Sequence, residues 1–294
     1  MRSEVTDSID VSVLTPSYGY GRFIADSIES VIRQEGLHVE HIVQDGGSKD
    51  ETLDVLRSFD DQVVWISEPD QGQSDALNRA LTMATGRWVA WLNADEFYLP
   101  GGLASLIHEA ERSDADVVYG DAIEVDRDGK MLELRPAHPF VPLILRSYGP
   151  FPNTASVVMR RESLGVDPWD PTLKVVMDWD LYLGLQQKRA TFRYLPYPVG
   201  AYRHHEDQMS AGPGRGQVAE VRERYQIPSG QVYRKAGLTI HRIYKLVARS
   251  YLRQLRARSL RGADLRWFED GLGIEHFQAL LERCYGSREK RPEG

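Results

Sequence analysis

The chain has 294 residues, of which 41% are hydrophobic and 27% charged, a balance that argues against a wholly disordered chain and fits one large or two modest domains. Its formal net charge of −7 argues against nucleic acid as a partner, and its single cysteine, Cys284, excludes an intramolecular disulfide and a cysteine-rich zinc site. No run reaches the ~18 consecutive apolar residues of a spanning helix, and the polar, acidic residues 1–10 predict no secretory signal.

Short apolar runs alternate with amphipathic segments over the first two thirds of the chain. Runs of strand length, each ended by turn residues, lie at residues 11–14, 41–43, 63–66, 88–92 and 116–119. Between them, apolar residues recur at helical spacing at residues 23–32, 53–59, 76–84 and 103–110. This alternation predicts an α/β fold with βαβ crossovers and a mostly parallel, mixed sheet flanked by helices. Ligands bind beyond the carboxyl ends of the strands in such sheets, which is where Asp45, Asp70, Asp95 and Asp121 lie.

The pattern changes after residue 121. Residues 123–125 and 131–134 flank a turn and predict a hairpin. We expect further strands at residues 156–159, 192–195 and 199–202, and a helix that begins near Asp178. Residues 211–216 are interpreted as a linker, beyond which the chain is predicted to be helical to about residue 284.

Six polar segments follow these strands and form the candidate site. The first, residues 15–21, leads into a helix, so its N–H groups could face an anion and Pro16 and Tyr18 could frame a base. It matches neither the G-x-G-x-x-G fingerprint nor a phosphate loop with lysine, and an ordinary βα turn remains the alternative. In the second, residues 44–52, Asp45 either accepts hydrogen bonds from a base or ribose or orders its own turn.

The third and fourth segments carry further carboxylates. Asp75 lies in the first turn of a helix, where the helix dipole favours it, and it could face the same cleft as Asn78 one turn later. Asp95 follows an apolar strand, where an acid suits Mg²⁺ or Mn²⁺, and such a cation could bridge two phosphates. The alternative role of Asp95 is to cap the following helix.

The fifth and sixth segments lie later in the chain. Residues 177–180 stand at the head of a helix, where a carboxylate such as Asp178 could be a general base or a plain cap. In residues 202–210, His205 follows a strand end and could reach a phosphate or the metal, although a lone histidine is more often structural.

Taken in this order, the six segments resemble the inverting glycosyltransferases of family 2, which have the nucleotide-diphosphosugar-binding GT-A (Rossmann-like) fold. The resemblance covers about residues 10–210. Two positions depart from the family pattern, Glu96 where many members have a second Asp and Met177 where many have Glu. The matching motifs are T-P-S-Y at 15–18, D-G-G-S-x-D at 45–50, S-E-P-D-x-G-Q-x-D-A-x-N at 67–78, W-L-N-x-D at 91–95, M-D-x-D-L at 177–181 and Y-R-x-H-x-x-Q-x-S at 202–210.

The resemblance implies a role for each matching residue. Asp178 would be the catalytic base, and Asp95 and His205 would bind Mn²⁺ or Mg²⁺. The donor or acceptor sugar would contact Asp121, Trp179 and Asp180. The nucleotide would be bound by Pro16, Ser17, Tyr18, Asp45, Asp75, Asn78 and Asn93.

The implied activity is a metal-assisted, inverting transfer of a sugar from a nucleotide-diphosphate donor, with UDP as the default, to a glycan or lipid-linked hydroxyl in surface polysaccharide or glycolipid biosynthesis. Residues 1–210 would form the catalytic domain, with a nucleotide-sugar half at about 10–121 and an acceptor half at about 122–210, and residues 211–294 a helical C-terminal extension. We expect a cytoplasmic protein. The alternative is a catalytically silent sugar-nucleotide-binding or scaffold protein; a nucleotidyltransferase would need a glycine-rich first loop bearing Lys or Arg.

The extension is strongly basic. Residues 232–266 hold ten Lys/Arg and one acid, Asp264, a local charge of +9 that leaves −16 for the rest of the chain. Two hypotheses remain for this amphipathic helix: it packs its apolar stripe on the catalytic domain, or it lies on an anionic membrane surface, such as the inner face of the plasma membrane. The stripe comprises Ile240, Ile243, Tyr244, Val247, Tyr251 and Leu255, and the opposite face Arg242, Lys245, Arg249, Arg253 and Arg256.

Overall fold

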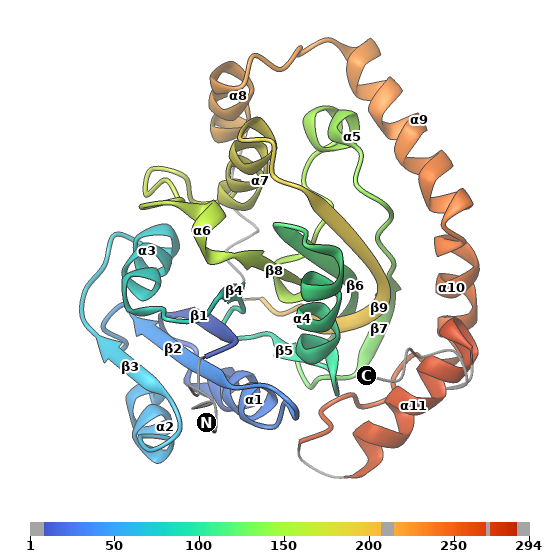
Figure 1. The fold of residues 1–294 in the computed structure, drawn as a ribbon. Coiled ribbons are helices and arrows are strands. Elements are labelled where there is room, and N and C mark those ends of the chain that lie inside the picture. The colour runs from blue at the N-terminus through green and yellow to red at the C-terminus, as the bar shows by residue number, and fades with distance from the viewer. Residues whose placement is uncertain (1–8, 207–214, 269–270, 287–294) are drawn as a thin grey trace, which may run out of the picture.

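In the computed structural model, which describes residues 9–206, 215–268 and 271–286, nine strands form one central sheet (Figure 1). Four of them, which carry the first candidate segments, are parallel: β3 (Val64–Ser67), β2 (Val39–Asp45), β1 (Val11–Ser17) and β4 (Trp88–Trp91). The antiparallel strand β8 (Val157–Arg160) joins β4 to β6 (Val117–Val125), which runs parallel to β9 (Phe192–Arg203). The sheet is completed by β7 (Met131–Arg135) on β6 and by β5 (Phe97–Tyr98) on β9.

Helices cover both faces of this sheet, which is why β1 is buried along its whole length. Side chains alternate along a strand, so neighbouring residues contact opposite layers. Val13 packs with α4 (Gly102–Ser113), and α1 (Gly21–Ile32) and α2 (Thr52–Ser58) cover the same face. Leu14 packs on the other face, which is covered by α3 (Gln73–Met83) and α7 (Met177–Gln187).

The predicted strands and helices of the first half are confirmed, but two pairs of predicted strands are each one continuous strand. Residues 116–119 and 123–125 merge into β6, and residues 192–195 and 199–202 merge into β9. The Gly120–Asp121 step is an irregularity in the β6–β9 register and not a turn. A Cβ on Gly120 would lie 2.4 Å from Val199 Cγ2, so only glycine lets the two strands pass this point. The sequence pattern also missed β5, α5 (Pro142–Ser147) and α6 (Arg161–Leu164).

The C-terminal extension is helical, as predicted, with α8 (Arg215–Arg224), α9 (Gln231–Val247), α10 (Ser250–Ala257) and α11 (Gly271–Tyr285). The predicted linker is wrong at its end, because Arg215 and Gly216 already belong to α8; its other residues, and the predicted boundary at 210/211, lie outside the described residues. The single basic helix is also wrong, because Arg249 takes a left-handed conformation with φ 55° and separates α9 from α10.

The extension shares a core with the sheet. Phe277 and Leu280 of α11 and Ala257 of α10 pack with Ile123 of β6 and Leu134 of β7. In the described part of the chain, no helix combines the length and apolar character needed to cross a membrane.

Candidate active site

A cavity of about 880 Å³ opens beyond the carboxyl ends of β1 and β4. Segments far apart in the sequence meet there, because the loops after parallel strands share one edge of the sheet. Seven of the predicted site residues line it: Pro16, Ser17, Tyr18, Asn93, Asp95, Asp178 and His205.

Asp95 and His205 form a close pair in this cavity. His205 Nε2 lies 2.9 Å from Asp95 Oδ2, and both side chains are almost fully buried. The imidazole ring packs on Phe23, with ring centroids 4.7 Å apart. Its Nδ1 atom and the Ser17 hydroxyl are buried without a hydrogen-bond partner among the described residues, which leaves polar atoms for a ligand to satisfy.

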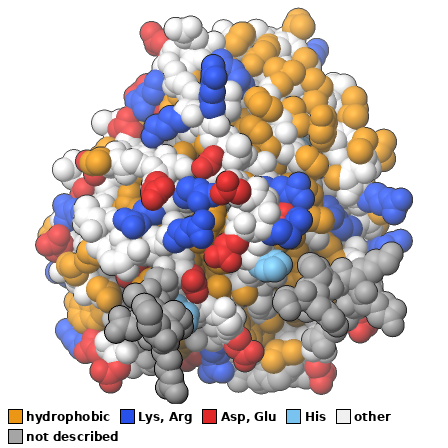
Figure 2. Space-filling view, viewed as in Figure 1, with side chains coloured by type: hydrophobic (Ala, Val, Ile, Leu, Met, Phe, Trp, Pro, Cys, Tyr) orange, Lys and Arg blue, Asp and Glu red, His pale blue; other side chains and the backbone are white. Residues whose placement is uncertain are grey.

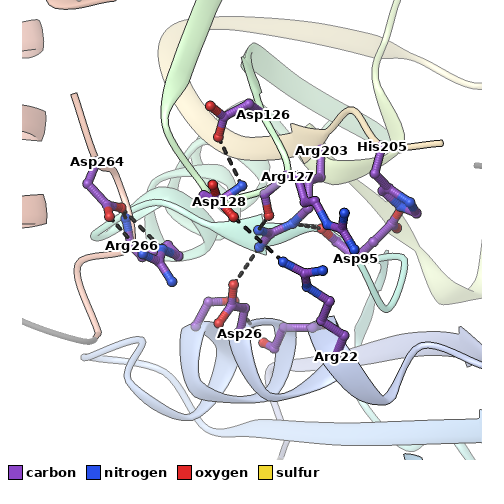
Figure 3. A network of polar contacts seen from close by, with 12 residues as sticks. Arg22, Asp26, Asp95, Asp126, Arg127, Asp128, Arg203, His205, Asp264 and Arg266 are labelled. Carbon is purple, nitrogen blue, oxygen red and sulfur yellow. Dashed lines mark hydrogen bonds and ion pairs between the residues drawn. The ribbon is translucent and has the colours of Figure 1, made fainter. Parts of the chain in front are cut away.

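A buried guanidinium supports this pair (Figure 3). Arg203, at the end of β9, is 1% exposed and donates from Nε to the main-chain oxygen of Asp95 at 3.0 Å. Its other nitrogens bind the Asp26 carboxylate at 2.5 Å and the main-chain oxygen of Arg127 at 2.6 Å. One side chain therefore ties α1, the β6–β7 turn and the loop after β4 to the end of β9, two residues before His205.

Asp95 and His205 can bind a hard divalent cation only if substrate supplies the remaining ligands. The described residues contain no group of three or more His, Cys, Asp or Glu side chains that could hold a metal. Mg²⁺ and Mn²⁺ are commonly held by one or two protein ligands together with water and substrate phosphates, so Asp95 and His205 are a sufficient protein share.

Glu96 is not part of this donor pair. Its Oε2 accepts the main-chain N–H of Asn93 at 3.0 Å. Burial, and then the charge of Asp95, raise the pKa of the Glu96 carboxyl well above its usual range. It therefore closes the turn after β4 as a largely uncharged group.

Asp178 lies at the N-terminal end of α7 and faces the same cavity. Burial raises the pKa of its carboxyl to about 6, although its Oδ1 accepts the Trp179 main-chain N–H at 2.7 Å. One turn later, the buried Tyr182 hydroxyl has no hydrogen-bond partner among the described residues. A carboxylate with this pKa is ionised near neutral pH and is basic enough to take a proton from a hydroxyl.

Asp45 does not line the cavity, in contrast to its predicted role in reading the base. It is fully buried, and its carboxylate accepts hydrogen bonds from the Gly47 and Ser48 main-chain nitrogens at 3.0 and 2.9 Å and from the Ser67 hydroxyl at 2.6 Å. The Ser48 hydroxyl then accepts the Gly19 N–H at 2.7 Å. Asp45 thus orders its own turn and, through Ser48, supports the loop after β1.

The two α3 residues predicted to contact nucleotide also face elsewhere. Asp75 forms an ion pair with Arg79 at 2.9 Å and accepts the Gln71 N–H. Asn78 donates to the Trp169 carbonyl at 2.7 Å and accepts the Trp169 N–H at 3.2 Å. Its amide therefore fastens the loop before α7 to α3, and neither residue lines the cavity.

The three predicted sugar contacts lie outside the cavity as well. The Trp179 ring is in the core, where Nε1 donates to the Leu145 carbonyl at 2.7 Å. Asp180 forms an ion pair with Arg224 of α8 at 2.9 Å. On an α-helix, successive side chains point about 100° apart, so Met177 and Asp178 of this motif line the cavity while Trp179 and Asp180 do not.

Asp121 instead anchors the C-terminal extension. It is fully buried, and burial raises the pKa of its carboxyl. It accepts hydrogen bonds from the Tyr194 and Tyr285 hydroxyls, each at 2.6 Å, and lies 3.6 Å from the Arg253 guanidinium. Two of these three partners belong to α10 and α11.

Lys174 lines the cavity although no sequence signal selected it. Its Nζ donates to the main-chain oxygen of Gln71, and its own main-chain N–H is accepted by Gln217 of α8 at 3.0 Å. It lies in an irregular loop without periodicity, where an exposed lysine is ordinary. Asp70, noted only as one of several acids after strands, lines the cavity too.

Comparison with known proteins agrees with the resemblance in the sequence. The family model for glycosyl transferase family 2 matches residues 12–163, just over half of the chain. The chain is 30% identical over 178 residues to an uncharacterized glycosyltransferase of Nostoc sp., and this match covers 55% of the chain but only 54% of that relative. It is 27% identical over 211 residues to a PGL/p-HBAD biosynthesis glycosyltransferase of Mycobacterium tuberculosis, covering 65% of the chain and 75% of that protein.

Solved structures share the fold. S. aureus TarS in complex with UDP-GlcNAc superposes with a TM-score of 0.60 at 17% identity, over 94% of this chain and 82% of that one. The mannosyltransferase PcManGT from Pyrobaculum calidifontis, in complex with GDP-Man and Mn²⁺, gives 0.53 at 16% identity, over 95% and 88%. The expected GT-A fold, a mixed α/β sheet flanked by helices, is confirmed. With the family model covering residues 12–163, the chain belongs to glycosyl transferase family 2.

Proposed function

We propose that the chain transfers a sugar from a nucleotide-diphosphate donor to an acceptor hydroxyl with inversion at the anomeric carbon. The observation that carries this proposal is that the Asp178 carboxylate and the Asp95–His205 pair face one cavity of about 880 Å³. A volume of this size is typical of small-molecule and cofactor sites. UDP-GlcNAc and GDP-Man in the two structural relatives support a nucleotide sugar as the occupant.

The nucleoside would lie at the end of β1. Tyr18 is 67% exposed at the cavity wall, so its ring is free to stack on a base, and the Ser17 hydroxyl has no partner within the part of the chain that the structure describes. Asp70 would take the hydrogen-bonding role first predicted for Asp45. We assign Asp45, Asp75 and Asn78 to the support of these loops, because their polar atoms are already bonded to neighbouring residues.

Asp95 and His205 would hold Mn²⁺ or Mg²⁺ against the donor diphosphate. When bound there, the cation supplies positive charge to a leaving group that carries negative charge. Lys174 would add a second positive charge at the cavity wall. Because the leaving diphosphate is already a stable anion, the site needs no acid to protonate it.

Asp178 would be the general base. The acceptor oxygen forms a bond to the anomeric carbon, its proton passes to the Asp178 carboxylate, and the bond from that carbon to the diphosphate oxygen breaks with its electron pair on the diphosphate. A single displacement from the opposite face inverts the configuration, as in inverting glycoside hydrolysis. A base of this kind contributes about 10²–10⁴-fold in rate.

The acceptor we propose is a glycan or lipid-linked hydroxyl in surface polysaccharide or glycolipid assembly, with a hexose as the transferred sugar. The relative named for PGL/p-HBAD biosynthesis supports this direction. Residues 1–210 would act as the catalytic domain, with the extension fastened to it through Asp121. We place the protein in the cytoplasm, peripherally on the inner face of the plasma membrane.

The test is release of UDP from UDP-GlcNAc with Mn²⁺, and of GDP or dTDP from their sugars, in wild type and Asp178→Asn. We expect the variant to lose about 10²–10⁴-fold in rate while UDP affinity stays within about threefold. Asp167→Asn is the matched control, since Asp167 is exposed at φ 46°, a conformation that asparagine accepts. Turnover of Asp178→Asn within a few-fold of wild type would overturn the base assignment. Nucleotide binding by wild type without release from any donor would favour the silent binding protein.

A further inference from the structure

The C-terminal extension exposes large hydrophobic side chains to solvent. Val232, Leu246 and Val247 of α9 are 82%, 69% and 76% exposed. Figure 2 shows hydrophobic side chains gathered on the upper right of the molecule, where α9 runs in Figure 1. We call the following residues the α9–α10 face: Val232, Ile243, Leu246, Val247, Tyr251, Leu252 and Leu255.

This face is outward because a different side of α9 is used for packing. Gly237 is buried so closely that a Cβ would lie 1.8 Å from the Ser147 hydroxyl of α5. His241 lies 3.0 Å from His138 through ring nitrogens and stacks on Tyr148. With 3.6 residues per turn, Gly237 and His241 point roughly 150° away from the centre of the apolar residues of α9.

The second helix repeats the arrangement. Ser250 of α10 donates to the Ala137 carbonyl at 2.9 Å, and Arg253 turns inward to Asp121. Leu252 and Leu255 are 51% and 53% exposed on the other side. Most of the predicted apolar stripe therefore faces outward, and only Ile240, which is half-buried, and Tyr244, whose ring lies 5.9 Å from that of His138, pack toward the rest of the protein. The placement of Arg253 on a solvated basic face is wrong.

Positive charge borders the α9–α10 face. No Asp or Glu occurs between Val232 and Ala263. Because the two helices carry no acid of their own, an anionic partner is favoured beside their exposed cations. Exposed cations beside the face are Lys235, Arg242, Arg249, Arg256 and Arg258.

We infer that the α9–α10 face docks on an anionic lipid bilayer. The free energy of these exposed apolar side chains falls when they leave water for the boundary between headgroups and acyl chains. The bordering Lys and Arg side chains add electrostatic attraction to anionic headgroups. A second copy of the chain is disfavoured as the occupant, because a two-fold contact would set the cations of one copy against the same cations of the other. The inference stands apart from the proposed transfer reaction, since none of these residues lines the cavity.

The experiment is flotation of the full chain with vesicles of phosphatidylcholine, with and without about a quarter phosphatidylglycerol. We expect recovery with the anionic vesicles at least tenfold above that with neutral ones, falling at high salt. The double variant Leu246→Ser/Val247→Ser should lose about tenfold or more. Val166→Ser, which alters a valine 91% exposed elsewhere, is the matched control and should float like wild type.

Three results would overturn the inference. Absence of wild type from anionic vesicles removes the bilayer as the partner. Equal flotation of wild type and the double variant would show that the α9–α10 face is not the surface that binds the vesicles. If light scattering shows that the wild type is a dimer and the double variant a monomer, the face binds a second copy of the chain and not a bilayer. Circular dichroism and UDP affinity, which we expect to match wild type, confirm that both variants fold, since all three substituted side chains are exposed.

Discussion

The guanidinium of Arg203 and the main-chain oxygen of Asp95 meet at 3.0 Å inside the protein, where Arg203 is buried and does not line the cavity. Asp95 itself faces His205, whose ring packs on Phe23, and Arg203 lies 4.9 Å over that same Phe23 ring. A single buried cation therefore fixes both the backbone of Asp95 and the ring beneath His205. Its charge is met by Asp26 at 2.5 Å.

We predict that Arg203→Lys raises the Mn²⁺ concentration needed for half-maximal activity by about tenfold, because lysine cannot reach three acceptors with a planar fork. Stability should fall by about 1–3 kcal/mol. Asp26→Asn is the comparison, since it breaks the ion pair but leaves the contact with Asp95. It should cost stability without a similar change in Mn²⁺ requirement. An Arg203→Lys enzyme that is less stable but has the wild-type Mn²⁺ requirement would make Arg203 a structural residue only.

The raised pKa of Asp178, about 6, sets the expected pH dependence of the reaction. A general base must be ionised, so kcat/KM should fall about tenfold per pH unit below pH 6 and level off above it. A pH–rate profile of UDP release measures this directly. A profile that stays flat from pH 5 to 7 would show that Asp178 is not the group that accepts the proton.

The same group affects stability with the opposite sign. Its folded-state pKa lies above the usual value of 3.8 for an aspartate, so folding favours the protonated form and stability is lost as pH rises from about 4 to 6. Asp178→Asn removes this loss, and above pH 6 it should be on the order of 1–3 kcal/mol more stable than wild type. Thermal unfolding of both proteins at pH 4 and pH 7 tests it. The gain should be larger at pH 7.

The architecture was predictable because each strand and helix carries its own pattern. Buried parallel strands are short apolar runs, and the helices between them have one apolar face. The merged strands β6 and β9 were not predictable in this way. Gly120 has the composition of a turn, and only its close approach to Val199 reveals that the strand continues through it.

The site was predictable in position but not in orientation. A carboxylate at the end of a strand lies at the correct edge of the sheet, as Asp95 does, yet so does Asp45, and Asp121 lies inside β6. What separates them is which neighbours use their oxygen atoms. The partners of Asp121 include Arg253 and Tyr285, more than a hundred residues later, and no local pattern encodes that contact.

Asp121→Asn tests this reassignment. The change leaves the Arg253 charge without its buried partner, so stability should fall by about 3–5 kcal/mol, while UDP affinity should stay within about threefold. Asp114→Asn is a matched surface control, since its side chain is 88% exposed and its ion pair with Arg160 is worth little. Thermal unfolding and calorimetric titration with UDP and with UDP-GlcNAc give the readouts. A tenfold loss of UDP-GlcNAc affinity with unchanged stability and unchanged UDP affinity would restore Asp121 to the sugar site.

Lys174 lies in the loop before α7, and its ammonium group lines the cavity. It also donates to the main-chain oxygen of Gln71, in the loop before α3, and so connects these two loops at the cavity wall. A positive charge beside the donor diphosphate lowers the free energy of the bound donor, so Lys174→Gln should raise the donor KM by about five- to tenfold with a smaller change in kcat. The KM effect should shrink at high salt, because the side chain is exposed and its charge is screened. Lys188→Gln, in the cap that follows α7, is the control and should leave KM unchanged, as its Nζ contacts the Leu164 carbonyl and lies outside the cavity lining. A fall in kcat with unchanged KM would show that donor binding does not depend on the Lys174 charge. Lys174 would then act by ordering the loop through its hydrogen bond to the Gln71 carbonyl.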